Sequence, residues 1–270
     1  MNPIITTHVR LDFAGRRAAK GLTIAQFSDI HIGPAFRPRA FAAAVDRLAA
    51  IHPDLYVLTG DLTGMAPLSR YADVVAVQLH RLSAPFGKFA IWGNHDCLGS
   101  PSLFPQVIKA GGFCLLENAK TVLWPGGPVI GGLADGLASI PNVRLLERVQ
   151  APFRLLLLHE PDLLNQVTPY SFDLALAGHT HGGQIRLPGR GAVVLPELGK
   201  HYPAGLYRVR GGLLYVNMGL GASDVPLRWR APGELTVFHL RIPEEAFSGL
   251  RPGGLDKSAE NGARRRLNIK

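Results

Sequence analysis

Five apolar segments of this 270-residue chain are followed by polar sequences rich in Asp, Asn and His. Imidazole and carboxylate groups are common ligands of divalent metal ions, and an amide oxygen can also bind one. An imidazole in addition has a pKa suited to donating a proton near neutral pH. The five polar sequences are Asp29-Ile30-His31, Gly60-Asp61, Gly93-Asn94-His95-Asp96, His159 and Gly178-His179-Thr180-His181.

Each of these sequences has an ordinary structural explanation when it is considered alone. An Asp-x-His triplet is common, a Gly-Asp pair is usually a turn, and a histidine after four leucines, such as His159, is more often a buried structural residue. His179 and His181 are more informative, because side chains two residues apart on an extended backbone point to the same face. The repetition of the pattern after all five segments favours one shared site. The remaining histidines lack the pattern and are interpreted as surface or structural residues: His8, His52, His80, His201 and His239.

Strands and helices that alternate in the first half of the chain must position these groups. Apolar strands joined by amphipathic helices predict parallel pairing through crossover connections, in a sheet covered on both faces. In such a sheet, ligands bind beyond the carboxyl ends of the strands. The second half is rich in short strands and predicts a second sheet packed on the first. The predicted strands before the polar sequences are 22–27, 55–58, 88–92, 153–158 and 172–177, and the main helices are 38–51 and 70–82.

The other predicted elements are shorter. Ser100-Pro101 is a typical helix start, since serine caps a helix and proline suits its first position. We predict one domain over residues 1–243 and a basic, disordered tail over 244–270. The remaining predicted helices are 101–110, 142–149 and 162–168, and the remaining strands are 4–13, 113–116, 121–124, 129–133, 185–187, 193–195, 204–210, 213–217 and 234–241.

Composition limits the classes of protein that this chain can represent. Hydrophobic residues make up 47% of it, which is enough for a folded core, and two cysteines, Cys97 and Cys114, do not form a disulfide framework. The formal net charge of +9 favours an anionic substrate or surface. Much of this charge lies near the two ends of the chain, so we expect solvated tails and no nucleic-acid partner. Without an apolar leader or a membrane span, we expect a cytoplasmic protein, with peripheral membrane contact left open.

Taken together, the five polar sequences resemble the signature of the calcineurin-like metallophosphoesterases. The resemblance covers about residues 22–242. Further motifs are similar to the bacterial YkuE/YaeI-type phosphodiesterase subgroup, which also contains a UDP-diacylglucosamine pyrophosphatase of lipid A synthesis. The resemblance implies a four-layer α-β-β-α sandwich of two mixed sheets flanked by helices. The motifs that carry the narrower resemblance are Gly182-Gly183-Gln184-Ile185-Arg186, Gly199-Lys200, Ala204-Gly205-Leu206-Tyr207 and Asn217-Met218-Gly219-Leu220-Gly221.

The resemblance also implies a dinuclear metal centre that hydrolyses a phosphodiester. A hydroxide that bridges the two ions would attack phosphorus in line. His95 would protonate the leaving oxygen or stabilise its charge, and Asp96 would hold the His95 ring. Nitrogen and oxygen ligands without a thiolate suit Mn²⁺, Fe or Zn²⁺. By this pattern Asp29, His31 and His181 would hold the first ion, Asn94, His159 and His179 the second, and Asp61 would bridge both.

Substrate contacts are less well defined by the sequence. Gln184, Arg186 and Lys200 follow the last metal-binding motif and are candidates for binding a phosphate, although an exposed basic loop explains them equally well. Leu220, Val225, Leu227 and Trp229, with Arg228 and Arg230 nearby, could instead form an apolar wall for a lipid substrate.

Two other classes of function compete with the enzyme. A metal-free interaction scaffold on the same fold would be expected to have lost ligands, and all of them are present in this chain. A nuclease would need a basic groove with stacking aromatic residues. The sequence does not set the oligomeric state.

Overall fold

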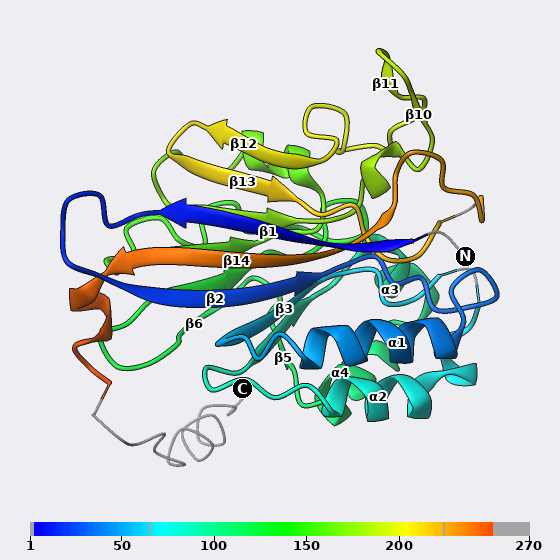
Figure 1. The fold of residues 1–270 in the computed structure, drawn as a ribbon, viewed down its shortest axis with the longest axis horizontal. Coiled ribbons are helices and arrows are strands. Elements are labelled where there is room, and N and C mark those ends of the chain that lie inside the picture. Colours follow the sequence, from blue (N-terminus) through cyan, green and yellow to red (C-terminus); the bar gives the residue numbers. More distant parts are fainter. Residues whose placement is uncertain (1–2, 65, 224, 251–270) are drawn as a thin grey trace.

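Two six-stranded β-sheets form the centre of the protein (Figure 1). The computed structural model describes residues 3–64, 66–223 and 225–250. In the first sheet the strand order is β1-β14-β2-β3-β4-β5, and β2 to β5 run parallel. β14 is antiparallel to β2, and β1 lies at the edge beside it, as predicted for residues 4–13. These strands are β1 (Ile4–Asp12), β2 (Ala19–Phe27), β3 (Leu55–Thr59), β4 (Lys88–Ile91), β5 (Cys114–Leu115) and β14 (Gly233–Pro243).

The second sheet is also mixed, with the order β12-β13-β9-β8-β7-β6. Its four central strands run parallel, and an antiparallel strand closes each edge. A separate two-stranded hairpin projects from the body of the protein at the upper right of Figure 1. The strands of the second sheet are β6 (Ala119–Val122), β7 (Val129–Gly132), β8 (Arg154–Leu157), β9 (Leu174–Ala177), β12 (Gly205–Val209) and β13 (Gly212–Val216), and those of the hairpin are β10 (Arg186–Leu187) and β11 (Gly191–Ala192).

Three helices cover the outer face of the first sheet: α1 (Pro38–Ala49), α2 (Ala72–His80) and α4 (Phe104–Ala110). Proline at the first position of α1 suits a helix start, because its missing N–H has no partner there in any case. The apolar side chains of α1 are buried at the helical spacing that the sequence predicted. A further short helix, α3 (Asn94–Gly99), lies where we expected only a turn.

The outer face of the second sheet is covered differently. Its apolar cluster packs against a 3₁₀-helix, η2 (Pro161–Asn165), and against the turns around Leu145 and Leu146. The predicted helix over 142–149 is wrong: this segment forms turns, and Arg148 has a φ of 60° that a helix does not allow. The two-sheet α/β sandwich is therefore confirmed, while turns and 3₁₀ structure form its fourth layer.

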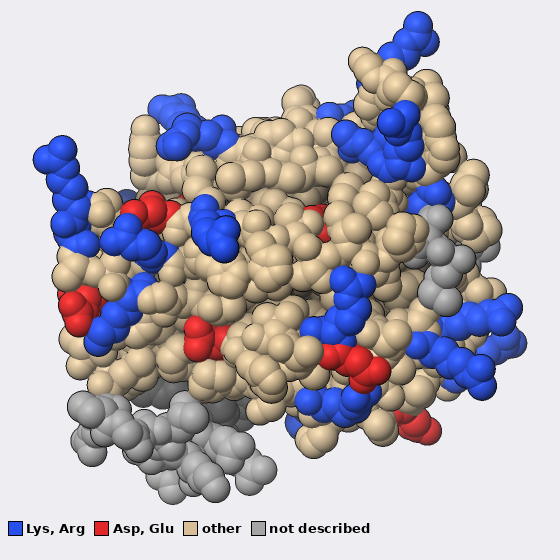
Figure 2. Space-filling view, viewed as in Figure 1, with Lys and Arg blue, Asp and Glu red and all other residues tan. Residues whose placement is uncertain are grey.

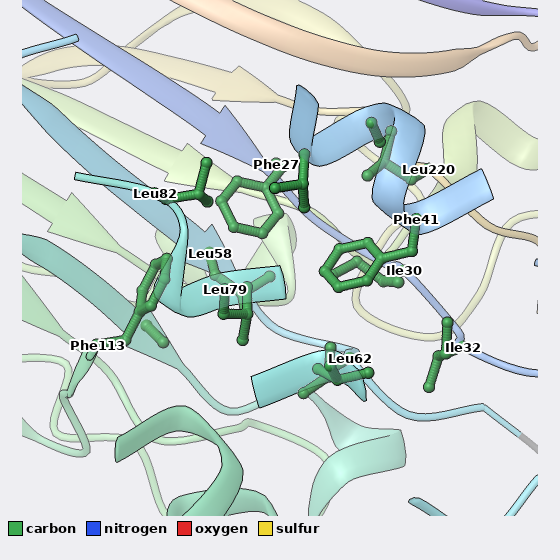
Figure 3. Packing of buried hydrophobic residues seen from close by; sticks show 14 of the residues in the cluster. Phe27, Ile30, Ile32, Phe41, Leu58, Leu62, Leu79, Leu82, Phe113 and Leu220 are labelled. Atoms are coloured by element: carbon green, nitrogen blue, oxygen red, sulfur yellow. The ribbon is translucent and has the colours of Figure 1, made fainter. Parts of the chain in front are cut away.

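The helix-side core also holds the segments that follow the strands. Figure 3 shows Ile30, Ile32, Leu62 and Leu220 among the same apolar side chains as Phe41 of α1. All four are buried, with at most 4% of their surface exposed. The loops at the carboxyl ends of the strands are therefore anchored in the core, and their polar side chains are held in fixed positions.

The packed structure extends beyond the predicted boundary at residue 243. A 3₁₀-helix, η4 (Glu244–Phe247), follows β14, and its Phe247 ring stacks on Trp124 in the core between the sheets. The rest of the predicted tail, 251–270, lies outside the described residues. The described helices all lack the combination of length and hydropathy that a membrane crossing requires.

Candidate active site

Loops that follow five parallel strands supply the polar side chains of the site. Three of these strands, β2, β3 and β4, belong to the first sheet, and β8 and β9 belong to the second. Backbone hydrogen bonds join these loops: the amides of Asp29 and Ile30 donate to the carbonyls of Gly60 and Asp61 at 3.0 and 2.7 Å. Across the sandwich, the Leu220 amide donates to the Ser28 carbonyl at 3.0 Å. Segments far apart in the sequence thus form one rigid framework.

Two glycines of the motifs permit close approach of these loops. A Cβ atom on Gly93 would lie 2.5 Å from the backbone nitrogen of Asp61 and would overlap its carboxylate. A Cβ atom on Gly178 would overlap Asp29 Oδ2 and Ser28 Oγ. The Gly-Asn-His and Gly-His-x-His motifs therefore need glycine because a carboxylate from another strand occupies the space of a side chain.

The first group of candidate ligands consists of Asp29, His31 and His181. The Nε2 atoms of His31 and His181 lie 3.0 Å apart, and His181 Nε2 lies 3.5 Å from Asp29 Oδ1. The backbone amide of His179 donates to both oxygens of Asp29 at 3.0 Å and fixes that carboxylate. One ligand atom from each of the three residues lies within 4.8 Å of the others, so the group could hold a metal ion.

The second group consists of Asp61, His159 and His179, with the same limit of 4.8 Å between ligand atoms. His159 Nδ1 lies 2.7 Å from the Thr59 carbonyl, and His179 Nε2 lies 2.7 Å from the Glu197 carbonyl. A carbonyl only accepts, so these two nitrogens carry protons, and in a neutral ring the other nitrogen has a lone pair. The carbonyl partners thus set both rings for metal binding.

Asp61 lies between the two groups. Its Oδ2 is 3.4 Å from His31 Nε2 and 3.3 Å from His159 Nε2, and its Oδ1 accepts the backbone N–H of His95 at 3.0 Å. One carboxylate therefore faces histidines of both groups.

Unpartnered polar atoms show that the site suits cations. Asn94 Oδ1 and His159 Nε2 are both buried and have no hydrogen-bond partner of acceptable geometry among the residues that the structure describes. Burying such atoms without a partner costs about 1–3 kcal/mol each. A divalent ion would satisfy both, because amide oxygen and imidazole nitrogen are suitable ligands.

The protonation states agree with this assignment. Burial lowers the pKa of His31 to about 3 and that of His179 to about 4, and it lowers the pKa of His181 as well. Burial raises the pKa of Asp61, but the His159 and His31 rings outweigh this effect and hold its pKa below the usual range. Burial lowers the pKa of His159, but Asp61, Asp29 and Glu160 outweigh this effect and raise it well above the usual value. At neutral pH the site therefore offers three neutral imidazoles and an ionised central carboxylate, and a metal ion at His159 would have to displace a proton.

His95 lies at the edge of this cluster. Its ring meets the His31 ring edge-to-face at 4.8 Å, and the residue is only partly buried. His95, His31 and Asp61 also form a group whose ligand atoms lie within 4.8 Å of one another, so His95 is close to the place where an ion would bind.

The structure corrects the role predicted for Asp96. Its Oδ1 accepts from the amide and the hydroxyl of Thr63 at 2.9 and 3.1 Å, and its Oδ2 accepts from the Gly93 amide at 3.1 Å. Both carboxylate oxygens of Asp96 thus hold the loop after β3 and the start of α3. They do not hold the His95 ring. Burial raises the pKa of Asp96 to about 7.

A cavity of about 440 Å³ opens above the cluster. Asp61, Asn94 and His95 lie among its lining residues, with Gln184 on the wall. The Gln184 amide is already bonded, since its Oε1 accepts from the Ser223 amide at 2.8 Å. Apolar side chains complete the wall: Leu137, Ile185, Val193, Val194, Pro196 and Val225, here called the apolar rim.

The other predicted substrate contacts are placed differently. Arg186 and Lys200 do not lie among the cavity-lining residues in the described part of the chain. The Arg186 guanidinium donates to the Gly182 carbonyl at 2.9 Å. Lys200 is exposed, and its backbone amide donates to the Asp162 carboxylate. Leu220 belongs to the helix-side core, whereas Val225 of the predicted apolar wall does line the cavity.

Sequence reasoning missed the role of one residue near the site. The sequence places Arg228 only beside a possible apolar wall, yet its guanidinium is buried and contacts the His181 ring. The spacing of residues contains no signal for this contact, because Arg228 lies on a long loop between β13 and β14.

Comparison with known proteins agrees with this geometry. The family description "Calcineurin-like phosphoesterase" matches residues 22–183. The chain is 37% identical over 238 residues to the uncharacterized metallophosphoesterase YkuE of Bacillus subtilis strain 168, and the match covers 82% of this chain and 79% of that protein. It is 34% identical over 196 residues to the phosphodiesterase YaeI of Escherichia coli strain K12, covering 70% of each.

Among solved structures, the 5'-nucleotidase precursor of Thermus thermophilus resembles this chain with a TM-score of 0.45 and 14% identity, over 84% of this chain and 55% of that one. The family match covers more than half of the chain, and the match to YkuE exceeds 30% identity. The protein belongs to the calcineurin-like phosphoesterase family.

The close approach at Gly93 gives a direct test of this geometry. In Gly93→Ala the new methyl group must displace the Asp61 carboxylate. We expect the turnover of a phosphoester to fall about a hundredfold, because a shift of about 1 Å in a group of the site can have an effect of that size. The matched control is Gly21→Ala, since a Cβ atom on Gly21 meets nothing within 4 Å. Equal activities of the two variants, with both folded by circular dichroism, would contradict the geometry.

Proposed function

We propose that this protein is a metal-dependent phosphodiesterase that hydrolyses a P–O bond of a small anionic substrate. One observation carries the proposal. Candidate ligands from the ends of five strands lie together beside one cavity, which is lined by Asp61, Asn94, His179 and His181. Two of their atoms, Asn94 Oδ1 and His159 Nε2, are buried without a hydrogen-bond partner among the described residues. Two divalent cations, when bound, activate water at neutral pH and neutralise the charge that develops on the phosphate oxygens.

The residues divide into two sets around Asp61. Asp29, His31 and His181 would hold one ion, and Asn94, His159 and His179 the other, with Asp61 shared. This set contains oxygen and nitrogen donors without sulfur, which suits Mn²⁺, Fe or Zn²⁺.

His95 is the group placed to move a proton. It lines the cavity and is partly exposed, whereas the imidazoles of His159, His179 and His181 are buried. A substrate phosphate in the cavity would therefore lie within reach of the His95 ring, which would protonate the leaving oxygen. The relatedness to YaeI, named a phosphodiesterase, supports a diester over a monoester.

The surface charge supports an anionic substrate. Figure 2 shows more Lys and Arg than Asp and Glu on the face that is viewed, with several at the corner where Figure 1 places the β10–β11 hairpin. Within the described residues, however, the cavity lining contains neither Lys nor Arg. We infer that the surface charge attracts an anionic substrate towards the site, whereas the described cavity lining itself offers no basic side chain to a nucleic-acid backbone.

Removal of the His95 ring tests its role. We expect His95→Ala to lower kcat about a hundredfold or more for a diester with a poor leaving group, and much less for bis-p-nitrophenyl phosphate, because a good leaving group needs no proton. The assays would be run with Mn²⁺ before and after chelation, and p-nitrophenyl phosphate would serve as the monoester for comparison. The control variant is His80→Ala, because His80 is exposed and lies at the end of α2.

Two results would contradict the proposal. Hydrolysis that survives complete chelation would exclude a metal-dependent reaction. Protein that binds neither Mn²⁺ nor phosphodiesters would favour an interaction scaffold instead. Equal loss for both leaving groups in His95→Ala would remove only the proton-donor role.

A second candidate is a lipid-linked substrate of the UDP-diacylglucosamine type, cleaved at its pyrophosphate. The apolar rim supports it, because Val193, Val194 and Val225 line the cavity and yet remain 53%, 72% and 51% exposed. Exposed apolar side chains that continue from a catalytic cavity offer a surface for an acyl chain. Peripheral contact with a membrane would be consistent with such a substrate.

Substitution in the rim separates the two candidates. Burying a valine side chain contributes about 1.5 kcal/mol, so Val194→Asp should raise KM about tenfold for a substrate with an acyl chain, while KM for bis-p-nitrophenyl phosphate stays unchanged. Val122→Asp, on β6 and 50% exposed, is the matched control. If both substrates respond alike to Val194→Asp, the rim does not bind an apolar group.

A further inference from the structure

Asp162 is a buried carboxylate that lies three residues after one of the candidate metal ligands. It belongs to η2, and 7% of its surface is exposed. Its Oδ2 accepts from the Lys200 amide at 2.8 Å, and its Oδ1 accepts from the His201 amide at 3.1 Å. The backbone amide of Asp162 donates to the Leu198 carbonyl at 2.8 Å. This one residue therefore binds the segment 197–201 near both of its ends.

The segment 197–201 also contacts a candidate metal ligand. The Glu197 carbonyl lies 2.7 Å from His179 Nε2. A carbonyl only accepts, so that nitrogen carries the proton, and in the neutral ring Nδ1 has the lone pair. Nδ1 is therefore the atom that His179 can offer to a metal ion. The position of one carbonyl thus decides which nitrogen of the ring is available.

Hydrogen bonds to two residues hold this segment in place. It contains no helix or strand, and Leu198 has a φ of 57°, in the left-handed region that a residue other than glycine adopts only where its surroundings enforce it. Among the described residues, the hydrogen bonds that join 197–201 to distant parts of the sequence go only to Asp162 and His179. The position of the Glu197 carbonyl therefore depends on Asp162.

The segment also packs directly on the loop of His179. A Cβ atom on Gly199 would lie 3.0 Å from Thr180 Cγ2 and 3.4 Å from His179 Cδ2. The segment and the ring are thus close-packed, and a displacement of the segment changes the surroundings of the ring.

We propose that Asp162 is a positioning residue for His179. It fixes the segment 197–201, and the Glu197 carbonyl of that segment sets the tautomer and the orientation of the His179 ring. The Asp162 carboxylate acts through the backbone of the segment. This inference rests on the proposed function, since that function makes His179 a metal ligand.

The tautomer of His179 in the metal-free protein gives the first test. ¹⁵N NMR of the histidine rings at neutral pH distinguishes a proton on Nε2 from a proton on Nδ1. The intact protein should show His179 protonated on Nε2 alone. In Asp162→Ala the Glu197 carbonyl is no longer held, and we expect a mixture of the two tautomers.

Binding of Mn²⁺ at equilibrium, measured by dialysis without substrate, gives the second test. Asp162→Ala should weaken binding about tenfold, the lower limit for changing an outer partner of a metal ligand. Asp162→Asn keeps an oxygen that can accept from the backbone amides, so it should weaken binding less. His201→Ala removes an exposed ring that lies 2.9 Å from Asp162 Oδ2 but keeps the backbone amide, so it should bind Mn²⁺ as the intact protein does.

Asp173→Ala is the matched control. Asp173 also accepts from a backbone amide, that of Arg154 at 2.7 Å, and it pairs with the guanidinium of the same residue at 3.1 Å. It lies directly before β9, whereas His179 follows the other end of that strand. Its removal should therefore lower stability without changing the tautomer of His179 or the affinity for Mn²⁺.

A second variant keeps the inference testable if Asp162→Ala does not fold. In Gly199→Ala the new methyl group meets the Thr180 side chain and shifts the same segment, so we expect the same mixture of tautomers and weaker binding of Mn²⁺.

Three results would overturn the inference: a His179 proton on Nδ1 in the intact protein, an unchanged tautomer in a folded Asp162→Ala or Gly199→Ala variant, or equal affinities for Mn²⁺ in Asp162→Ala and Asp173→Ala. Failure of the intact protein to bind Mn²⁺ would instead contradict the proposed function. The tautomer is measured without metal, so the two failures can be distinguished.

Discussion

The concentration of buried polar groups beyond the ends of the strands is the constraint on which the structure depends. Asp29 and Asp61 are at most 1% exposed, and four imidazoles are buried beside them. Such groups are costly to bury unless a compensating charge is present. Burial raises the pKa of Asp29 to about 6, because the loss of hydration outweighs the hydrogen bonds that this carboxylate accepts. Two divalent cations would supply the missing charge.

The backbone is adapted to this arrangement at a cost. Asp29, His31 and Asp61 have φ values of 49°, 44° and 53°, and His179 and His181 have values of 71° and 52°, all in the left-handed region. Such conformations cost about 1–3 kcal/mol each for residues other than glycine and persist only where the surroundings enforce them. Here the surroundings are the core, which holds Ile30 between Asp29 and His31, Leu62 directly after Asp61, and Leu220 from the loop after β13. The same packing that stabilises the fold therefore holds the site.

The sequence predicted the strands before the polar residues, and the convergence of their ends, because both follow from short-range patterns, namely apolar runs and the residues directly after them. The predicted strand over 193–195 is wrong, since these residues form a bend and irregular structure after β11. The sequence did not predict α3, because six residues that begin with Asn94 directly after Gly93 resemble a turn. The family resemblance implied that Asp96 holds the His95 ring, whereas the carboxylate of Asp96 on α3 accepts hydrogen bonds from Thr63. The contact of Arg228 with His181 joins loops 47 residues apart, and neither loop has a periodic pattern.

The most direct test of the central claim is anomalous diffraction at the manganese edge from crystals soaked in MnCl₂. The account predicts two anomalous peaks, one among Asp29, His31 and His181 and one among Asn94, His159 and His179, with Asp61 between them. Anomalous density found only at the protein surface, or none at all in a well-ordered cavity, would contradict it.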